Sequence, residues 1–383
     1  MTEPGLRIEA EPAFRTRHAN PYNALLAEAL QREGLVVRDL SFWRLLTSRT
    51  DIVHLHWPDL TFLSGDRPWF IRLRMVLFAG LYAVARSRGT RLVWTVHNVE
   101  AHEQRATPAL RAALRRMLVR RVDGIVALSA RNLEDALTAY PEFADVPHAV
   151  TPHGHYRDSY DFSATRSEAR AALGVPDDVA LAVTVGQVRP YKNIPGLLEA
   201  FRGVDDARAA LAIVGRATGE LATTIEELAA RDPRVRVDLR FQSDDEIALW
   251  LRASDLVVLP YAAVTNSGSA LLALSADRPV LLPELGSLTE LASAVGPAWV
   301  RTFRGPLDAA ALAAALPGTP RLSPGWGADL SSFEWDGIAK STVDLYTRVL
   351  AGAGRRLPRK GLPIAGAVRG TPVTHVQPPG ASP

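Results

Sequence analysis

The sequence predicts an α/β protein built from two doubly wound units, each a parallel sheet covered by helices on both faces. Three observations lead to this prediction. Short runs rich in β-branched residues alternate with stretches that have the 3.6-residue spacing of amphipathic helices. The strand runs are apolar throughout, as expected for strands buried on both faces. The pattern also breaks near residues 151–177 and then starts again.

The first unit is expected to hold most of the N-terminal part of the chain. Its strands are predicted at residues 6–10, 35–38, 52–55, 92–96 and 124–128. Its helices are predicted at residues 21–32, 71–88, 108–121 and 130–139. Because helices connect most of the successive strands, the strands should run parallel and end along one edge of the sheet.

The second unit repeats this arrangement. Its strands are predicted at residues 180–185, 210–214, 235–239, 256–259 and 279–282, and its helices at residues 194–202, 220–231, 244–253 and 267–275. We therefore divide the chain into an N-terminal domain (1–153), a second domain (154–331), a last helix (332–352) and a tail (353–383). The tail is basic, rich in Gly and Pro and poor in periodic apolar residues, so we expect it to be disordered.

The composition excludes several classes of protein. With 383 residues, 47% of them hydrophobic and 22% charged, the chain is neither wholly disordered nor a coiled coil. The absence of cysteine excludes a disulfide framework, Cys-ligated zinc, an iron–sulfur centre and a cysteine nucleophile. No secretory signal pattern is visible at the N-terminus, so we expect a cytoplasmic protein.

The net charge of +3 is unevenly distributed. Residues 1–150 carry +4, residues 151–352 carry −6 and the tail carries +5. No nucleic-acid-binding motif accompanies the basic residues, so nucleic acid is not expected as a partner, and anionic lipid headgroups fit the basic first domain better. The arginines of the predicted helices 71–88 and 108–121 would make this peripheral contact, unless they only form solvated faces.

An apolar run, "MVLFAGLYAVA" at residues 75–85, bears on the same question. It is shorter than the roughly 20 residues that a membrane-spanning helix needs. We interpret it as a buried helix, and a helix lying on a membrane surface is the alternative.

The loop that opens the second domain predicts a phosphate site. In "VTVGQVRPYKN" (183–193) a strand ends, Gly186 turns the chain, and Arg189 and Lys192 lie three residues apart before a helix begins. Two cations beside the amides of a helix N-terminus match the charge of a diphosphate.

A second small polar stretch points to the same ligand. In "TNSGS" (265–269) Asn266 or Ser267 can cap the following helix, while Gly268 lets the backbone approach a ligand. The free N–H groups of the first turn, at Gly268 and Ser269, suit an anion. Together with the Arg189 and Lys192 loop, this stretch predicts one anion-binding site.

These strings resemble the donor half of GT-B nucleotide-sugar glycosyltransferases of the family-4-like clan, nearest to bacterial exopolysaccharide mannosyltransferases. "LAIVG" (211–215) and "LWLRASDLVVLPY" (249–261) continue the resemblance, and "TVHN" (95–98), "ALS" (127–129) and "TPHG" (151–154) match in order in the first domain. The resemblance covers about residues 1–351. It implies two Rossmann-like domains facing a cleft, with the C-terminal helix crossing back to the first domain.

The resemblance implies transfer of a sugar from a nucleotide-diphosphate donor, a GDP- or UDP-sugar, to an acceptor hydroxyl. The acceptor would be a glycan, a lipid-linked sugar or a secondary metabolite. Arg189 and Lys192 would hold the donor diphosphate without a metal, and the sequence has no Asp-x-Asp motif, so no metal or other cofactor is expected. A nucleotide-sugar epimerase and a catalytically silent sugar-nucleotide-binding protein are the alternatives.

One departure from the family concerns its Glu-x7-Glu element. The corresponding positions are Leu272 and Val264 or Thr265, which are not acidic. The carboxylate that contacts the nucleotide ribose is therefore absent, or Glu284 or Glu290 supplies it. The reaction can be retaining or inverting, and the missing element favours inversion.

Candidate catalytic residues follow strands of the first domain. His97, in "WTVHNVEAHE" (94–103), matches the family histidine that contacts the donor sugar near the reacting carbon. Glu100 and Glu103 are candidates for the base that deprotonates the acceptor if the reaction inverts. Asp59, in "HLHWPD" (54–59), is another candidate base.

Three more features of the first domain are less specific. His54 and His56 share one face of a strand, so at least one of them can be a packed residue. His153 lies in the connection between the domains and either lines the cleft or packs in a hinge. The loop with Arg15 and Tyr22 would lie over the substrate phosphates in the family, or be an ordinary solvated loop.

Overall fold

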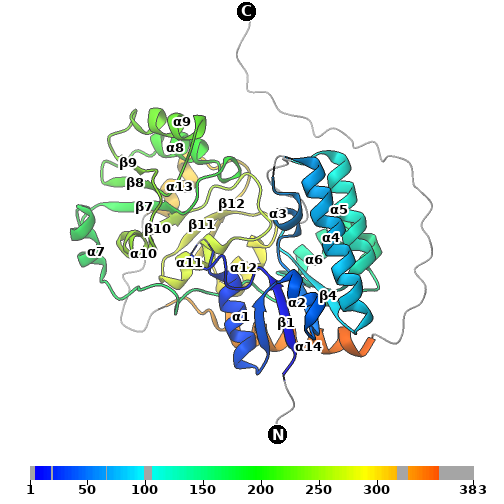
Figure 1. Ribbon diagram of the computed structural model, residues 1–383. Helices are drawn as coiled ribbons and strands as arrows, with labels where there is room; N and C mark the ends of the chain where they lie inside the picture. The colour runs from blue at the N-terminus through cyan, green and yellow to red at the C-terminus, as the bar shows by residue number, and fades with distance from the viewer. Residues whose placement is uncertain (1–4, 19, 66, 99–105, 317–326, 353–383) are drawn as a thin grey trace, which may run out of the picture.

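The computed structural model describes residues 5–18, 20–65, 67–98, 106–316 and 327–352 (Figure 1). Two parallel six-stranded sheets, each with helices interleaved along the chain, make up the fold. This confirms the predicted α/β class and its two doubly wound units. The predicted disordered tail, 353–383, lies outside the described residues.

The first sheet has the strand order β2-β1-β3-β4-β5-β6. Its strands are β1 (Arg7–Glu11), β2 (Val36–Asp39), β3 (Ile52–Leu55), β4 (Arg91–Val96), β5 (Val122–Ala127) and β6 (His148–Val150). Its helices are α1 (Tyr22–Arg32), α2 (Phe42–Thr47), α3 (Pro58–Leu63), α4 (Pro68–Ser87), α5 (Pro108–Arg121) and α6 (Ala130–Ala139).

The second sheet has the order β12-β11-β10-β7-β8-β9. Its strands are β7 (Ala180–Val185), β8 (Ala209–Val214), β9 (Val235–Asp238), β10 (Leu256–Val258), β11 (Val280–Pro283) and β12 (Val300–Phe303). The associated helices are α7 (Arg166–Leu173), α8 (Ile194–Arg202), α9 (Glu220–Ala229), α10 (Asp244–Ala253), α11 (Gly268–Ser275), α12 (Leu288–Val295) and α13 (Ala309–Ala315).

The order of strands changes direction once in each sheet. In the first sheet this switch lies between β1 and β3, and in the second it lies between β7 and β10. Loops at the carboxyl ends of the two strands at a switch point diverge to opposite faces of the sheet, which leaves a crevice for a ligand. A ligand site is therefore expected at the loops that follow β1, β3, β7 and β10.

The last helix, α14 (Trp335–Ala351), returns to the first domain, as expected (Figure 1). It packs against α1, β5 and β6, and its Tyr346 hydroxyl lies 2.7 Å from His54 Nδ1. At its start, the Trp335 indole N–H donates to the carbonyl of His155 at 2.8 Å. A Cβ on Gly154 would lie 2.3 Å from the Trp335 ring, so this close approach requires glycine.

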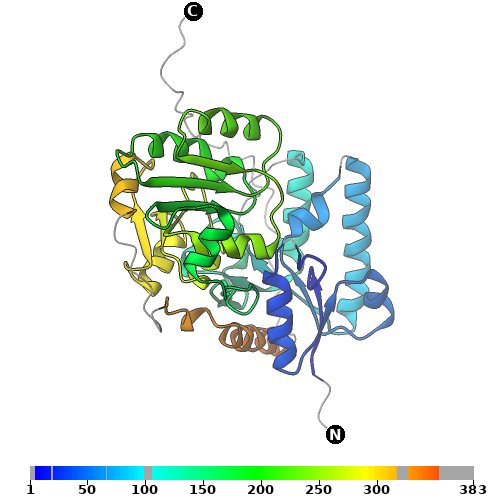
Figure 2. The ribbon, with the colours of Figure 1, turned by 90° about the vertical axis from the view of Figure 1, so that its left-hand side faces the viewer.

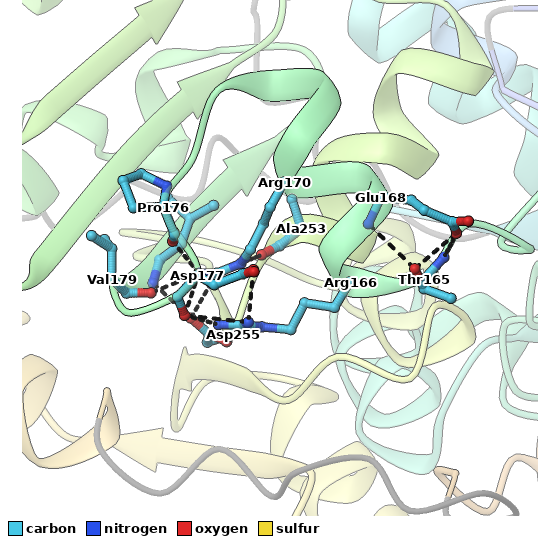
Figure 3. Close-up of polar contacts among 10 residues, drawn as sticks. Thr165, Arg166, Glu168, Arg170, Pro176, Asp177, Val179, Ala253 and Asp255 are labelled. Atoms are coloured by element: carbon cyan, nitrogen blue, oxygen red, sulfur yellow. Dashed lines mark hydrogen bonds and ion pairs between the residues drawn. The ribbon is translucent and has the colours of Figure 1, made fainter.

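A buried arginine secures the sheet edge opposite the switch-point loops of the second domain (Figure 3). Arg170 on α7 is fully buried and forms an ion pair with Asp255 at 2.5 Å. It also donates to the carbonyl of Ala253 at 2.9 Å, while Asp255 accepts the N–H of Leu181 at 2.8 Å. Because a buried charge needs such partners, this network joins α7 and α10 to the start of β7.

The predicted burial of residues 75–85 is wrong for one face of the helix. Met75, Phe78 and Tyr82 on α4 are buried in the core of the first domain, but Val76 is 67% exposed. Within the described residues, α4 is long and apolar enough to cross a membrane, and one of its sides packs against the domain. The helix therefore has two apolar sides, one packed in the core and the other facing solvent.

Candidate active site

The loop after β7 holds a lysine in an enclosed position. Gly186 turns the chain with φ of +91°, and the short 3-10 helix η2 (Pro190–Lys192) then leads into α8. The Lys192 side chain is only 7% exposed. Its Nζ lies 3.6 Å from where a Cβ on Gly186 would stand, and Ser269 Oγ lies 3.9 Å from that point. The structure thus brings Gly186, Lys192 and Ser269 together.

Among the residues that the structure describes, no carboxylate balances the charge of Lys192. Burial, and then the nearby charge of Arg189, lower the pKa of Lys192 to about 8. Lys192 forms no ion pair with any residue that the structure describes. A group held in this way gains from an incoming anion, because the anion would stabilise the ammonium form that burial disfavours. The loop can therefore bind a phosphate or diphosphate.

The start of α11 supplies the other part of this anion site. Ser267 caps the helix by accepting the N–H of Ala270, and the Tyr261 hydroxyl lies 2.9 Å from Ser267 Oγ. The first N–H groups of α11, those of Gly268 and Ser269, have no partner within the helix. They add the positive end of a helix dipole beside Lys192. Tyr261 was missed by the sequence analysis, because its place after the β10 strand gave no chemical signal.

In the first domain, two histidines meet behind the cleft. His97 follows β4 and His56 follows β3, and His56 Nδ1 lies 3.2 Å from His97 Nε2. The His97 ring stacks on Trp57 with 4.2 Å between the ring centres. Burial lowers the pKa of His97 well below its usual value, with smaller contributions from His153 and His54. At neutral pH this part of the site is therefore uncharged.

His54 is a packed residue. This is one of the possibilities that the sequence left open for His54 and His56. Its two ring nitrogens lie 2.7 Å from the hydroxyls of Tyr346 and Thr95, and burial lowers its pKa to about 3. The His54 ring also stacks on His56, with 4.3 Å between the ring centres. His54 thus supports His56, which in turn contacts His97.

The N-terminal end of α1 brings further polar atoms to this place. The Tyr22 ring lies 5.0 Å from His97 and 4.5 Å from His153, centre to centre. The Tyr22 hydroxyl and both amide atoms of Asn23 are buried, and none of them has a hydrogen-bond partner among the described residues. Buried polar atoms rarely stay unsatisfied, so they are suited to receive a ligand.

Asn23 was missed by the sequence analysis, although a signal was present. It shares the inner face of α1 with Leu26, Ala27 and Leu30, where an apolar residue is expected. Arg15 and Arg17, from the preceding loop, are engaged in ion pairs with Glu11 and Glu28.

The two domains touch at the site. Asn266 does not cap α11; instead its Nδ2 donates to the backbone carbonyl of His97 at 3.1 Å. His153 also lies at this contact, because a Cβ on Gly268 would stand 3.4 Å from its Nε2. His153 thus packs where the two domains meet. The loops that carry Lys192 and Ser269 consequently face the histidines across one junction.

The two carboxylates considered for a ribose contact are engaged elsewhere. Glu284 accepts from Arg304 Nε at 2.6 Å and from the Thr302 hydroxyl at 3.0 Å, and these bonds lower its pKa. Glu290 on α12 accepts the N–H groups of Ala130 and Arg131 at 3.0 and 2.8 Å. Glu290 therefore caps α6 of the first domain, a contact that the sequence analysis did not anticipate.

A pocket of about 540 Å³ lies beside this second contact between the domains. Arg131 on α6 lines it from the first domain, and Val264 and Gly286 line it from the second. Neither Lys192 nor His97 takes part in its lining. The pocket is therefore separate from the anion-binding loops.

Of the three candidate bases, only Asp59 lies within the described residues. Asp59 lies in the first turn of α3, two residues after Trp57, and burial raises its pKa while Arg111 lowers it. Glu100 and Glu103 lie outside the described residues. Among the described residues, no group of three His, Asp or Glu side chains could hold a metal ion.

Comparison with known proteins finds glycosyltransferases, both for the second domain alone and for nearly the whole chain. Residues 180–317 match the family described as glycosyl transferases group 1. A GDP-mannose:glycolipid 4-beta-D-mannosyltransferase of Xanthomonas campestris pv. campestris is 33% identical over 338 residues, which are 88% of this chain and 90% of that protein. A D-inositol 3-phosphate glycosyltransferase of Streptomyces scabiei is 26% identical over 366 residues, covering 90% of this chain and 79% of that protein.

Solved structures support the fold. A sucrose-phosphate synthase from Thermosynechococcus elongatus superposes with a TM-score of 0.64 at 17% identity, covering 91% of this chain and all of that one. An Anabaena protein solved with UDP-glucose has a TM-score of 0.58 at 16% identity, covering 91% and 99% of the two chains. These matches show a shared GT-B arrangement of two domains.

Proposed function

The chain belongs to the glycosyl transferases of group 1, and we propose that it transfers mannose from GDP-mannose to a hydroxyl of a glycolipid acceptor. That it is a glycosyltransferase using a nucleotide-sugar donor follows from its family. The choice of mannose, of guanosine and of a glycolipid is our proposal. It is supported by the activity for which the Xanthomonas relative is named, since that relative aligns with 88% of the chain. With such an acceptor, the enzyme would work as a peripheral protein at the inner face of a membrane.

The observation that carries the proposal is the enclosed Lys192, which faces Gly186 and Ser269 and lacks an anionic partner among the described residues. We assign this place to the donor diphosphate, with Arg189 beside it. Their positive charge, together with the helix dipole of α11, would stabilise the diphosphate as it leaves. The charge is held in place before reaction, so little reorganisation is needed when the bond to the sugar breaks.

We assign the sugar to the neutral surface across the junction. His97, with Trp57 behind it and Tyr22 beside it, presents aromatic faces and ring nitrogens rather than charges. In the reaction the acceptor oxygen forms a bond to the anomeric carbon, the bond from that carbon to the phosphate oxygen breaks, and the acceptor proton passes to a base. We propose Asp59 as this base among the described residues, because it lies in the turn after Trp57.

We further propose that the reaction inverts the anomeric centre. GDP-mannose is an α-glycoside, and the relative is named for a β-linked product. A single attack by the acceptor with one base gives this outcome and needs no second carboxylate. The absence of acidic residues at Val264 and Leu272 agrees with it.

A panel of nucleotide sugars tests the proposal. GDP-mannose should raise the melting temperature more than UDP-glucose or ADP-glucose at equal concentration, because a bound ligand stabilises the folded state. Incubation with a glycolipid extract should then release GDP and give a β-mannoside by NMR. Interconversion of free nucleotide sugars would indicate an epimerase, and binding without turnover would indicate a silent binding protein. Either result would overturn the proposal.

A further inference from the structure

We propose that the solvent face of α4, continued by α3, docks on the surface of an anionic lipid bilayer and brings the cleft to an acceptor carried by that bilayer. Burial and charge alone indicate this docking surface, independently of the reaction; only the lipid-borne acceptor rests on the proposed function. Figure 2 shows α4 as the long helix standing at the outer edge of the first domain.

The exposed side of α4 is almost entirely apolar. Its large exposed side chains recur at helical spacing and form one stripe: Trp69, Phe70, Leu73, Val76, Leu77 and Val84, which are 60%, 51%, 42%, 67%, 50% and 46% exposed. A soluble helix normally places charged residues on this face. A continuous apolar stripe in water marks a surface that meets another apolar phase.

The opposite side of α4 excludes a membrane-spanning orientation. Ile71, Met75, Phe78 and Tyr82 are at most 6% exposed and pack in the core of the first domain. Crossing the bilayer would expose this core, so the helix must lie along the surface. Only the stripe can then enter the boundary between headgroups and acyl chains.

Charge around the stripe favours an anionic membrane over a second copy of the chain. The charged residues of Pro68–Ser87 are Arg72, Arg74 and Arg86, with no acid among them. Arg86 is turned inward to Asp123, whereas Arg72 is exposed, as is Arg67 just before the helix. Two copies meeting through this face would oppose like charges, but anionic headgroups would neutralise them.

Helix α3 connects the stripe to the cleft. It lies between α4 and the second domain (Figure 1), and its Leu60 is 69% exposed. Arg74 of α4 donates to the Ser64 hydroxyl at the end of α3, at 3.1 Å. At the other end of α3, Trp57 stacks on His97. A lipid headgroup beside Leu60 would therefore be one short helix away from the proposed sugar site.

Sedimentation of the full chain with vesicles tests the proposal. Wild type should bind equimolar phosphatidylglycerol–phosphatidylcholine vesicles, and alkaline carbonate should release it. The double variant Trp69→Gln/Val76→Gln should bind at least about tenfold more weakly, because two exposed apolar side chains no longer enter the interface. Phe241→Gln, which changes an equally exposed residue (66%) of the second domain, should bind like wild type.

Four outcomes would overturn the docking surface: no vesicle binding by wild type, unchanged binding by the double variant, resistance to carbonate, or a wild-type dimer in sedimentation velocity that the double variant abolishes. The melting-temperature rise with GDP, measured on the same samples, separates this proposal from the reaction. If GDP stabilises both wild type and the double variant while wild type does not bind vesicles, docking is wrong and the donor assignment stands. If vesicle binding behaves as expected and no nucleotide stabilises the protein, docking stands and the proposed function is wrong.

Discussion

The two sheets place different chemistry at equivalent positions. In the second, the loops that follow the switch-point strands β7 and β10 hold a buried ammonium group and the start of a helix. In the first, the segments that follow β1 and β3 hold the aromatic rings of Tyr22 and Trp57 and the imidazole of His56. Topology determines where a ligand can bind, whereas the side chains on the loops determine which part of it binds.

The difference in charge suits the two ends of a nucleotide sugar. Lys192 stays largely protonated near neutral pH even though burial lowers its pKa to about 8. His56 and His97 have pKa values far below neutral because they are buried, so they add no charge. A diphosphate needs a charged site such as that of Lys192, whereas a sugar ring needs a neutral site such as that of His56 and His97. The junction formed by Asn266 and the His97 carbonyl holds the two in contact.

The largest expected effect is a loss of turnover when the proposed base of the first domain, Asp59, is replaced. Asp59→Asn should lower kcat about 10²–10⁴-fold, because the amide cannot take the acceptor proton. The affinity for GDP, measured by calorimetry, should change little. Glu134→Gln is the control, since Glu134 is an exposed carboxylate on α6 of the same domain. Near-normal turnover in Asp59→Asn would move the base to another residue, with Glu100 and Glu103 the next to be tested.

A smaller loss is expected on the second-domain side. Lys192→Ala removes a charge-assisted contact to the diphosphate, worth about 1.5–3 kcal/mol, so GDP-mannose should bind roughly ten- to a hundredfold more weakly. Arg189→Ala should act in the same direction. Lys340→Ala on α14 removes an exposed lysine and should bind GDP-mannose as wild type does. Unchanged affinity in Lys192→Ala would refute the phosphate assignment.

The pH dependence of donor binding tests whether Lys192 supplies a charge that the histidines of the first domain do not. Because only the ammonium form attracts the diphosphate, affinity for GDP-mannose should fall as the pH rises through about 8. From pH 7 to pH 9 the decrease should be about tenfold, the loss expected for one group that deprotonates. Lys192→Ala should lose this dependence, and it also controls for ionisation of the guanine. The buried histidines should add no further step between pH 6 and pH 8.

Much of the framework could be predicted from the sequence because it depends on local patterns. The predicted limits of α5, α6 and β7 agree with the structure, because the apolar pattern lies within each segment and Thr107 and Ser129 cap the two helices from the residue just before them. Helix α7 was missed although Thr165 and Glu168 form a capping box, because the segment was assigned to the break between domains. The strand β12 was missed because it has only four residues, two of which, Arg301 and Thr302, are polar.

The candidate site was only partly predictable because it depends on contacts between domains. The pairing of Gly186 with Lys192 arises within one loop, and the motif indicated it. The use of Asn266 to hold the His97 carbonyl depends on how the two sheets face each other, which no local pattern encodes. The same holds for Glu290, which caps a helix of the other domain. The partners of side chains that reach across the junction cannot be predicted until the positions of both domains are known.

A still smaller effect concerns the junction itself. Asn266→Ala removes one hydrogen bond to the His97 carbonyl, worth about 0.5–1.5 kcal/mol, so kcat should fall roughly two- to tenfold. Asn266→Asp should be worse, because a carboxylate cannot donate and would repel the carbonyl oxygen. The test is steady-state kinetics of both variants with saturating donor. If Asn266→Asp is as active as wild type, the contact does not position His97.

No effect at all is expected from removing divalent metal ions. We assign the charge that stabilises the leaving diphosphate to Lys192, Arg189 and the first turn of α11, so a metal would duplicate what these groups supply. Turnover of GDP-mannose in excess EDTA should therefore equal turnover in magnesium. A Lys192→Ala enzyme that regains activity on addition of Mg²⁺ would support the assignment further, because the cation would then replace the missing charge. Complete loss of wild-type activity in EDTA, restored by Mg²⁺ or Mn²⁺, would show that the cationic loop is insufficient and that the second domain binds its donor through a metal.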